Sequence, residues 1–172
     1  MTVPRFKVQG HGGCWSKLRR QVYTILEPNL NLHMYCTFYT SYRDYKAGPF
    51  TSPRNWITLD KEIIWDFPSY FLEWNHPDVP KPLRWMEDGH WGMEGHQPAQ
   101  LMREYLQTPV NQLFARVFYL DYWGLINILR SGDRRIGQRR LRAFADRLDP
   151  IEPAMKVMRR RFELRAGGRR DG

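Results

Sequence analysis

Residues 30–39, LNLHMYCTFY, decide the fold class, because apolar and polar side chains alternate along them with a period of two. One face of such a segment carries the apolar side chains of Leu30, Leu32, Met34, Cys36 and Phe38, and the other carries Asn31, His33, Tyr35, Thr37 and Tyr39. Successive side chains of a strand point to opposite faces of a sheet, so the pattern predicts a half-buried β-strand. Next along the chain, the apolar runs 56–59 and 63–65 flank the polar turn 60–62 and predict a β-hairpin.

Helical periodicity is found on both sides of this predicted sheet. Before it, Trp15, Leu18, Val22, Ile25 and Leu26 recur at helical spacing until Pro28, which predicts an amphipathic first helix. After it, helical spacing begins at Ala99, and a second helix is expected with Thr108 as its N-cap and Pro109 as its first residue.

The C-terminal part of the chain is predicted to be helical throughout. Residues 110–129 are apolar on most sides and predict a central core helix, with a possible break at Gly124. The sequence Ser131-Gly132-Asp133 is expected to end that helix and to cap the next one, and the last two helices are expected over 133–148 and 153–165. The predicted fold is therefore α+β, with an N-terminal helix, a small antiparallel sheet made of a strand plus a hairpin, and a C-terminal helical half.

The length of 172 residues predicts one domain, for which we assign residues 12–166, with flexible termini at 1–11 and 167–172. Residues 46–53 contain Gly48, Pro49 and Pro53 and are expected to form a loop. Residues 75–98 contain four prolines and three glycines without helical or strand periodicity, and they predict a long loop within the domain. Loops of this length are uncommon in compact domains and usually serve a function.

Composition excludes two classes of protein. A hydrophobic content of 42% is too high for a disordered chain, and a mean hydropathy of −0.65 without a long uncharged apolar run excludes an integral membrane protein. Two cysteines, Cys14 and Cys36, are too few for a disulfide framework, and the first residues lack the apolar core of a secretory signal. We therefore expect a cytoplasmic protein with no membrane partner, and the pattern specifies no oligomeric state.

The net charge of +9 is unevenly distributed along the chain. From Arg130 to Gly172 there are fourteen Lys and Arg residues against six Asp and Glu residues, a net charge of +8, which is nearly the whole excess. Such asymmetry indicates either an acidic partner or a solvated, arginine-rich surface.

The densest basic segment is residues 132–142, GDRRIGQRRLR, which is predicted to be helical. At 100° per residue, Ile136, Leu141, Phe144 and Leu148 share one side of this helix, and Arg135, Arg139 and Arg142 gather on the opposite side. These three arginines, with the adjacent Arg134, are the candidate contacts to an acidic partner. Arg140 and Arg147 fall near the apolar stripe, and we expect both to snorkel or to pair with a carboxylate such as Asp133 or Asp121. Asp133 itself is expected to act as a cap or as a salt-bridge partner.

A second basic group follows in the last predicted helix. It contains Lys156, Arg159, Arg160 and Arg161, and Arg159 and Arg160 are added to the candidate binding residues. Guanidinium groups spaced along a helix can each contact a phosphate, and such contacts weaken as the salt concentration rises.

No catalytic or metal-binding pattern competes with this interpretation. His90, Glu94 and His96 lie among glycines in the long loop, without a second ligand cluster, so we expect no metal site and no cofactor there. No nucleophile, base and orienting group are spaced as in a known catalytic arrangement, which disfavours an enzyme without excluding one, because such groups can assemble in space. Tyr35, Tyr39 and Tyr42 beside Trp56 and Trp65 could form an aromatic binding platform, but cross-strand packing is the expected role of these rings.

Four motifs resemble those of a family of small bacterial proteins of uncharacterised function: Trp15-Ser16-Lys17-Leu18-Arg19, Thr40-Ser41-Tyr42-Arg43, Trp56-Ile57-Thr58-Leu59-Asp60, and the segment from Asp133 to Leu141. Together with residues 153–165 they span most of the chain. The sequence departs from the family pattern at Gln138, where lysine is common, and in the loop 75–98. The resemblance implies an intracellular bacterial α+β protein, and it implies no activity or cofactor.

The leading hypothesis from the sequence is a non-enzymatic binding protein whose basic C-terminal helix contacts an acidic partner, with RNA or DNA as the first candidate. The alternative is a protein-interaction module, antitoxin-like or immunity-like, that docks on a protein partner through its aromatic residues and the loop 75–98. An enzyme of unknown class is the third hypothesis.

Overall fold

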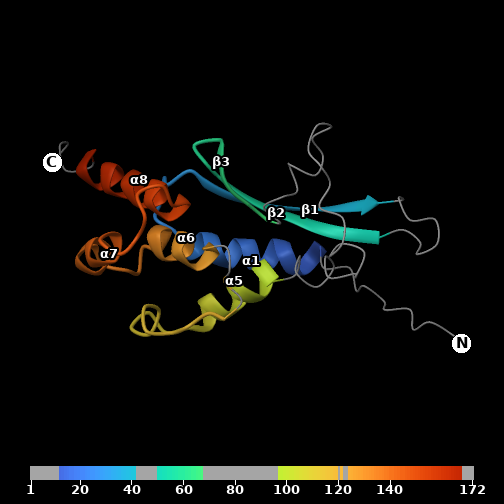
Figure 1. Ribbon diagram of the computed structural model, residues 1–172, viewed down its shortest axis with the longest axis horizontal. Coiled ribbons are helices and arrows are strands. Elements are labelled where there is room, and N and C mark those ends of the chain that lie inside the picture. The colour runs from blue at the N-terminus through green and yellow to red at the C-terminus, as the bar shows by residue number, and fades with distance from the viewer. Residues whose placement is uncertain (1–11, 42–49, 68–96, 120, 122–123, 168–172) are drawn as a thin grey trace, which may run out of the picture.

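The computed structural model describes residues 12–41, 50–67, 97–119, 121 and 124–167 (Figure 1). These residues form five helices and one three-stranded antiparallel sheet, which confirms the α+β prediction. In chain order the elements are α1 (Gly12–Ile25), β1 (Leu32–Ser41), β2 (Phe50–Leu59), β3 (Glu62–Phe67), α5 (Gln97–Gln107), α6 (Leu125–Gly132), α7 (Gln138–Ala145) and α8 (Pro153–Gly167).

The sheet has the order β1-β2-β3, with each strand antiparallel to its neighbour. The predicted hairpin is confirmed, because β2 and β3 are joined by Asp60 and Lys61, whose φ angles are 49° and 73°. A two-residue turn with both central residues in the left-handed region matches the right-handed twist of the strands that it joins.

The predicted loop over 46–53 is wrong for residues 50–53, because β2 already begins at Phe50. Pro53 pairs with Phe38 of β1, whereas the pairing of β2 with β3 reaches only from Leu59 to Asn55. Among the described residues, β2 has no pairing partner on the β3 side at Pro53, and a proline, which lacks an N–H, is tolerated at such an edge.

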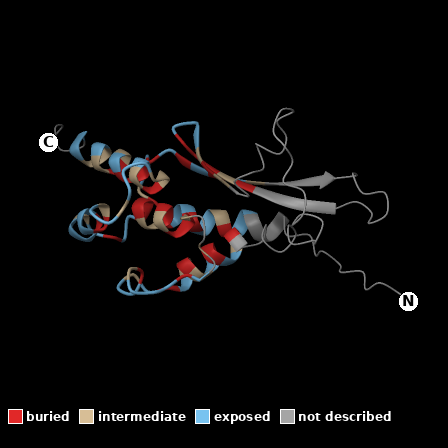
Figure 2. Ribbon diagram, viewed as in Figure 1, coloured by how far each residue is buried: buried red, intermediate tan, exposed pale blue. Residues whose placement is uncertain are grey.

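One hydrophobic core holds the described elements together. Met34 of β1 and Ile57 of β2, each 1% exposed, belong to this core together with Leu18 and Val22 of α1. Figure 1 shows α1 running along the sheet, α5 on the other side of α1, and α6, α7 and α8 grouped at one end. Buried residues gather on the sides of these elements that face one another (Figure 2). Of the helices in the described ranges, none is both long and apolar enough to cross a membrane.

The central helix predicted over 110–129 is wrong as a single element. Residues 110–115 form turns, and α6 begins only after Gly124, whose φ of 75° is left-handed. Thr108 is not an N-cap, because its hydroxyl donates a hydrogen bond to the carbonyl oxygen of Glu104 at 2.7 Å, back into the end of α5. The apolar character of the segment comes from loop side chains that enter the core, such as Leu113 (0% exposed) and Phe118 (8%), and not from a continuous helix.

The helix predicted over 133–148 is shorter than expected, since α7 begins at Gln138. The first helix, the first strand and the last helix lie close to where the sequence predicts them, although β1 covers Leu32–Ser41 instead of 30–39 and α8 continues to Gly167. Most of the loop 75–98 and the termini 1–11 and 168–172 lie outside the described residues, while Gln97 and Pro98 belong to α5.

Candidate functional site

The turn that precedes α7 is fixed to the end of α1 by backbone hydrogen bonds. The N–H of Glu27 donates to the carbonyl oxygen of Gly132, and the N–H of Arg134 donates to that of Ile25, each at 2.8 Å. Leu26 and Asp133 form the isolated β-bridge between these two donors. The bridge brings the start of the arginine-rich segment beside the α1–β1 connection, although more than a hundred residues separate them in the sequence.

Asp133 organises this turn from a fully buried position. Its carboxylate accepts hydrogen bonds from the guanidinium of Arg135, with Nη2 2.7 Å from Oδ2 and Nε 3.0 Å from Oδ1, and from the backbone N–H of Arg135 at 2.9 Å. The hydroxyl of Tyr105, in α5, donates to Asp133 Oδ2 at 2.9 Å. Burial and the neighbouring Asp133 carboxylate raise the pKa of Tyr105 well above its usual value, so the phenol remains a donor.

Arg135 therefore does not belong to the outward face of a helix, and its predicted helical placement is wrong. It lies in the turn before α7, and its side chain is only 30% exposed because it folds back onto Asp133. The prediction that Asp133 forms a salt bridge is confirmed, with Arg135 as its partner. The predicted pairing of Arg140 with Asp133 or Asp121 is wrong, because Asp133 pairs with Arg135 and the described structure holds no ion pair between Arg140 and Asp121.

The arginines of α7 point away from the core. Leu141 and Phe144 bury one side of the helix, and Arg139 and Arg142 lie 60° apart on the opposite side. Arg140 and Arg147 flank this side and are also exposed. We call Arg139, Arg140, Arg142 and Arg147 the α7 arginine surface. Within the described residues none of these four guanidinium groups has a hydrogen bond or an ion pair, although the exposed Asp146 and Asp149 lie near Arg147 in the sequence.

The basic residues of α8 are mostly engaged within the protein. The Arg161 side chain is fully buried, and it donates to Glu27 Oε2 at 2.8 Å and to the carbonyl oxygens of Ser131 and Ile136 at 3.2 and 2.8 Å. Arg160 Nε lies 3.1 Å from Asp60 Oδ2, and Lys156 Nζ lies 2.6 Å from Glu62 Oε1. The predicted second basic face is thus wrong for Arg161, whereas Arg159 is exposed and unpaired among the described residues.

Glu27 receives two arginines of α8. In addition to Arg161, Arg165 Nη2 lies 2.5 Å from Glu27 Oε2. Burial alone would raise the pKa of Glu27, but the hydrogen bonds from Arg165 and Arg161 outweigh it and lower the pKa below its usual value. The negative charge of Glu27 is therefore balanced by Arg161 and Arg165 of α8. The neighbouring Arg134 has no carboxylate partner in the described structure.

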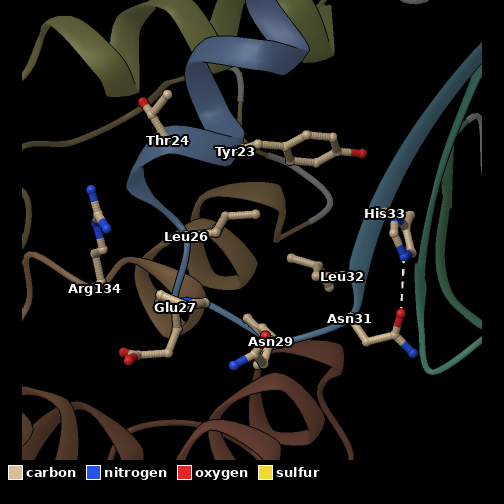
Figure 3. Close-up of a pocket in the computed structure, with 11 residues that line it drawn as sticks. Tyr23, Thr24, Leu26, Glu27, Asn29, Asn31, Leu32, His33 and Arg134 are labelled. Atoms are coloured by element: carbon tan, nitrogen blue, oxygen red, sulfur yellow. Dashed lines mark hydrogen bonds between the residues drawn. The ribbon is translucent and has the colours of Figure 1, made fainter.

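A shallow hollow of about 470 Å³ opens between the end of α1, the start of β1 and Arg134 (Figure 3). Its floor is made of the buried side chains of Leu26, Leu30 and Leu32. Its rim carries Tyr23, Thr24, Glu27, Asn29, Asn31, His33 and Arg134. Figure 3 shows Arg134 and His33 on opposite sides of the hollow, with Leu26 and Leu32 between them.

The aromatic residues proposed as a platform divide into two roles. Tyr35 and Trp56 stack with ring centroids 5.1 Å apart and an interplanar angle of 11°, which is the expected cross-strand packing, while Trp65 is buried in the core. Tyr42 and the histidine-containing loop segment 90–96 lie outside the described residues. Across the part of the chain that the structure describes, no three His, Cys, Asp or Glu residues are grouped to hold a metal ion.

A protein family matches the chain over residues 14–88 and 92–165, which is most of its length. The chain belongs to the SF0329 protein family. No curated protein and no solved structure matches it. In this SF0329 family member, the matched regions include the hollow, the turn at Asp133 and the α7 arginine surface.

Sequence reasoning missed the roles of four residues that shape this region of the SF0329 family member: Glu27, Tyr105, Arg130 and Arg161. Arg130 lies within 5.5 to 5.8 Å of the ring centroids of Phe114, Phe118 and Phe144, and its Nε donates to the carbonyl oxygen of Leu113 at 3.0 Å. Each of these side chains pairs with a group far away in the sequence. The periodicity of a sequence predicts which side of a helix or strand is apolar. It does not predict hydrogen bonds or ion pairs between residues that are far apart in the sequence.

Proposed function

We propose that the protein is a non-enzymatic binding protein that contacts an acidic partner through the α7 arginine surface and Arg134, and that this partner is a nucleic acid. One observation carries the proposal: five guanidinium groups between residues 134 and 147 have no partner in the described part of the protein. Most of the other C-terminal arginines are held by carboxylates or by backbone carbonyls.

The contrast between engaged and unengaged arginines matters because a long cationic side chain usually gains from burial of its stem or from an ion pair. Arg130, Arg135, Arg161 and Arg165 make such contacts, and they therefore explain part of the basic composition by folding alone. The α7 arginine surface is not explained in this way. Its charges raise the local positive potential, which attracts a polyanion and releases the counterions of its phosphates on binding.

The proposal includes a place of action. Such a protein works in the cytoplasm, where RNA and DNA are the abundant polyanions, and the resemblance described above favours a bacterial cell. The chemistry of the contact is phosphate recognition, which fixes orientation and affinity without reading a sequence.

The test is the affinity of the purified, nucleic-acid-free protein for short RNA and DNA across a salt series. We expect the logarithm of the association constant to fall linearly with the logarithm of the salt concentration, with a slope of about 0.7 to 0.9 per contacted phosphate. The double substitution Arg139→Gln/Arg142→Gln should lower that slope by about 1.4 to 1.8 if each arginine contacts one phosphate. Arg135 is left unchanged, because its guanidinium holds Asp133.

A matched control separates a localised surface from net charge. Lys17→Gln/Arg20→Gln removes two exposed positive charges from α1 and changes the net charge by the same amount. The proposal requires that this variant keeps most of the wild-type affinity. Equal losses in both double variants, or no binding of the wild type at low salt, would show that the α7 arginine surface is only solvated.

A protein partner is the second candidate function, and one feature of the described structure favours it. Val117 and Tyr119, in the segment between α5 and α6, are 62% and 80% exposed. Exposed apolar side chains of this size are common at protein interfaces. If Val117→Ser/Tyr119→Ser abolishes capture of one stoichiometric partner from the native host, while the α7 double variant retains it, the interaction-module hypothesis is favoured over nucleic-acid binding.

A further inference from the structure

The hollow beside Arg134 offers what a single nucleotide needs: an apolar floor, a cation at one side and unpaired polar groups at its rim. Its volume of about 470 Å³ lies in the range of small-ligand sites. Leu26, Leu30 and Leu32 form the floor and are 6%, 2% and 5% exposed, so only a small part of each buried side chain faces the hollow.

We propose that the hollow receives one unpaired base of a single-stranded nucleic acid, with the attached phosphate on Arg134 and the neighbouring phosphates on the α7 arginine surface. This inference rests on the proposed function and adds to it a preference for single strands. Bases in a duplex are stacked and paired, whereas an unpaired base can turn into a hollow and lie against apolar and aromatic side chains.

The wall of the hollow is held in a fixed orientation. The hydroxyl of Tyr23 accepts a hydrogen bond from the backbone N–H of Met34 at 2.9 Å, and the rings of Tyr23 and His33 meet edge to face with centroids 6.5 Å apart. Tyr23 is 37% exposed, so part of its ring surface is available to a ligand. A rigid aromatic wall contacts a planar base at little entropic cost.

Hydrogen-bond partners around the rim also define which groups are free. The Asn31 amide nitrogen donates to Asp60 Oδ1 at 2.8 Å, which leaves the Asn31 amide oxygen to accept the Nε2–H of His33 at 3.0 Å. In the neutral ring, His33 Nδ1 is then an acceptor. Asn29 has no hydrogen-bond partner in the described part of the chain, and an asparagine side chain can pair with adenine through two hydrogen bonds.

Charge and reach connect the hollow to α7. Among the described residues that line the hollow, Glu27 is the one carboxylate, and Arg161 and Arg165 balance it. A phosphate near Arg134 therefore meets little net repulsion. Five peptide units separate Arg134 from Arg139, so their Cα atoms are at most about 18 Å apart, a distance that a few nucleotides of a single strand can span.

The experiment compares adenine-containing single strands with duplexes of equal phosphate number, for both RNA and DNA. We expect the wild type to bind the single strand about tenfold more tightly than the duplex. Thr24→Trp fills the hollow from its rim, and Asn29→Gly removes the amide while keeping the backbone φ of 63° unstrained. Both variants should lose the single-strand preference and keep the salt slope of the wild type.

Gln21→Trp is the matched control for the added ring, because Gln21 is an exposed residue of α1 outside the hollow. It should behave as the wild type. A titration with adenosine monophosphate tests the hollow independently of α7. It should shift the NMR signals of the Leu26, Leu30 and Leu32 methyl groups saturably in the wild type. The same signals should not change in Thr24→Trp.

The outcomes separate the two proposals. Equal affinity for single strand and duplex, with methyl signals that do not respond to adenosine monophosphate, overturns the base-binding inference and leaves phosphate binding by α7 standing. Absence of oligonucleotide binding at low salt overturns the proposed function and the inference together. Retention of the single-strand preference by Thr24→Trp shows that the preference arises elsewhere, which also overturns the inference.

Discussion

At the scale of single residues, Asp133 shows how a buried carboxylate is made tolerable. An isolated buried charge is costly, and Asp133 avoids this cost by accepting hydrogen bonds from Tyr105 and from the Arg135 side chain and backbone. Tyr105 is 28 positions away in the sequence, so neither its role nor the pairing of Arg135 with Asp133 could be predicted from helical spacing.

Tyr105→Phe tests this network through the pH dependence of stability. At neutral pH we expect a loss of about 2 kcal/mol in the free energy of unfolding, because one hydrogen bond to a charged group disappears. In the unfolded chain Tyr105 ionises near pH 10, whereas burial and Asp133 keep it protonated in the folded protein. The folded state then binds more protons, and the contribution of Tyr105 to stability falls as the pH rises above about 10, by up to about 1.4 kcal/mol per pH unit.

Urea unfolding at pH 8 to 11 checks this prediction. The difference in stability between wild type and Tyr105→Phe should narrow above pH 10. Tyr119 is 80% exposed and has no described hydrogen bond, so it is the control. The free energy of unfolding of Tyr119→Phe should equal that of the wild type at every pH. A difference for Tyr105→Phe that stays constant across the range would contradict a buried, Asp133-linked phenol.

At the scale of elements, α6 is bounded by glycines that are needed for different reasons. Gly124 precedes the helix with φ of 75° and has open space around it, whereas a Cβ at Gly132 would lie 2.9 Å from Leu26 Cδ2 and 3.2 Å from Leu30 Cδ2. Gly124→Ala should therefore cost about 1–2 kcal/mol through backbone strain. Gly132→Ala should cost about 1–3 kcal/mol through overpacking.

Gly137, the N-cap of α7, is the control for the substitutions at Gly124 and Gly132. Its φ of −66° and ψ of 152° suit a side chain, and a Cβ at this position would have no atom within 4 Å. Gly137→Ser should keep or slightly raise the stability measured by thermal unfolding, because serine is a good N-cap. If all three substitutions changed the stability equally, neither backbone strain at Gly124 nor lack of space at Gly132 would explain why these positions are glycines.

The elements also show what periodicity can and cannot predict. Residues 30–39 were predictable because alternation maps directly onto the two faces of β1. The structure of residues 110–129 was not predictable, because Leu113 and Phe118 are buried although they lie in a turn and in irregular chain. In the sequence, such a run of apolar residues cannot be told from a buried helix. The exposure of Arg139 and Arg142 follows from the helical wheel, whereas the hollow does not, since the Leu26–Asp133 bridge assembles it from distant segments.

At the scale of the whole molecule, Arg161 ties the last helix to the start of the sheet. Its guanidinium joins Glu27, between α1 and β1, to the carbonyl oxygens at the end of α6 and in the turn before α7. The arginine-rich composition therefore has two parts that differ in environment. The buried Arg161 connects the N-terminal and C-terminal halves, whereas the arginines of the α7 arginine surface are exposed.

Glu27→Gln tests whether this connection stabilises the whole fold. The substitution leaves the fully buried Arg161 without a carboxylate, and we expect a loss of about 3 kcal/mol at pH 7 in urea unfolding. Because the pKa of Glu27 is lowered in the folded protein, its contribution is present above its unfolded pKa of about 4.5 and disappears as the pH falls through the folded value. The wild type should therefore lose its advantage over Glu27→Gln in acid. Glu62→Gln is the control, because it breaks the exposed pair with Lys156 and should lower the free energy of unfolding by less than about 1 kcal/mol. Equal losses for Glu27→Gln and Glu62→Gln would contradict a stabilising link between Glu27 and the buried Arg161.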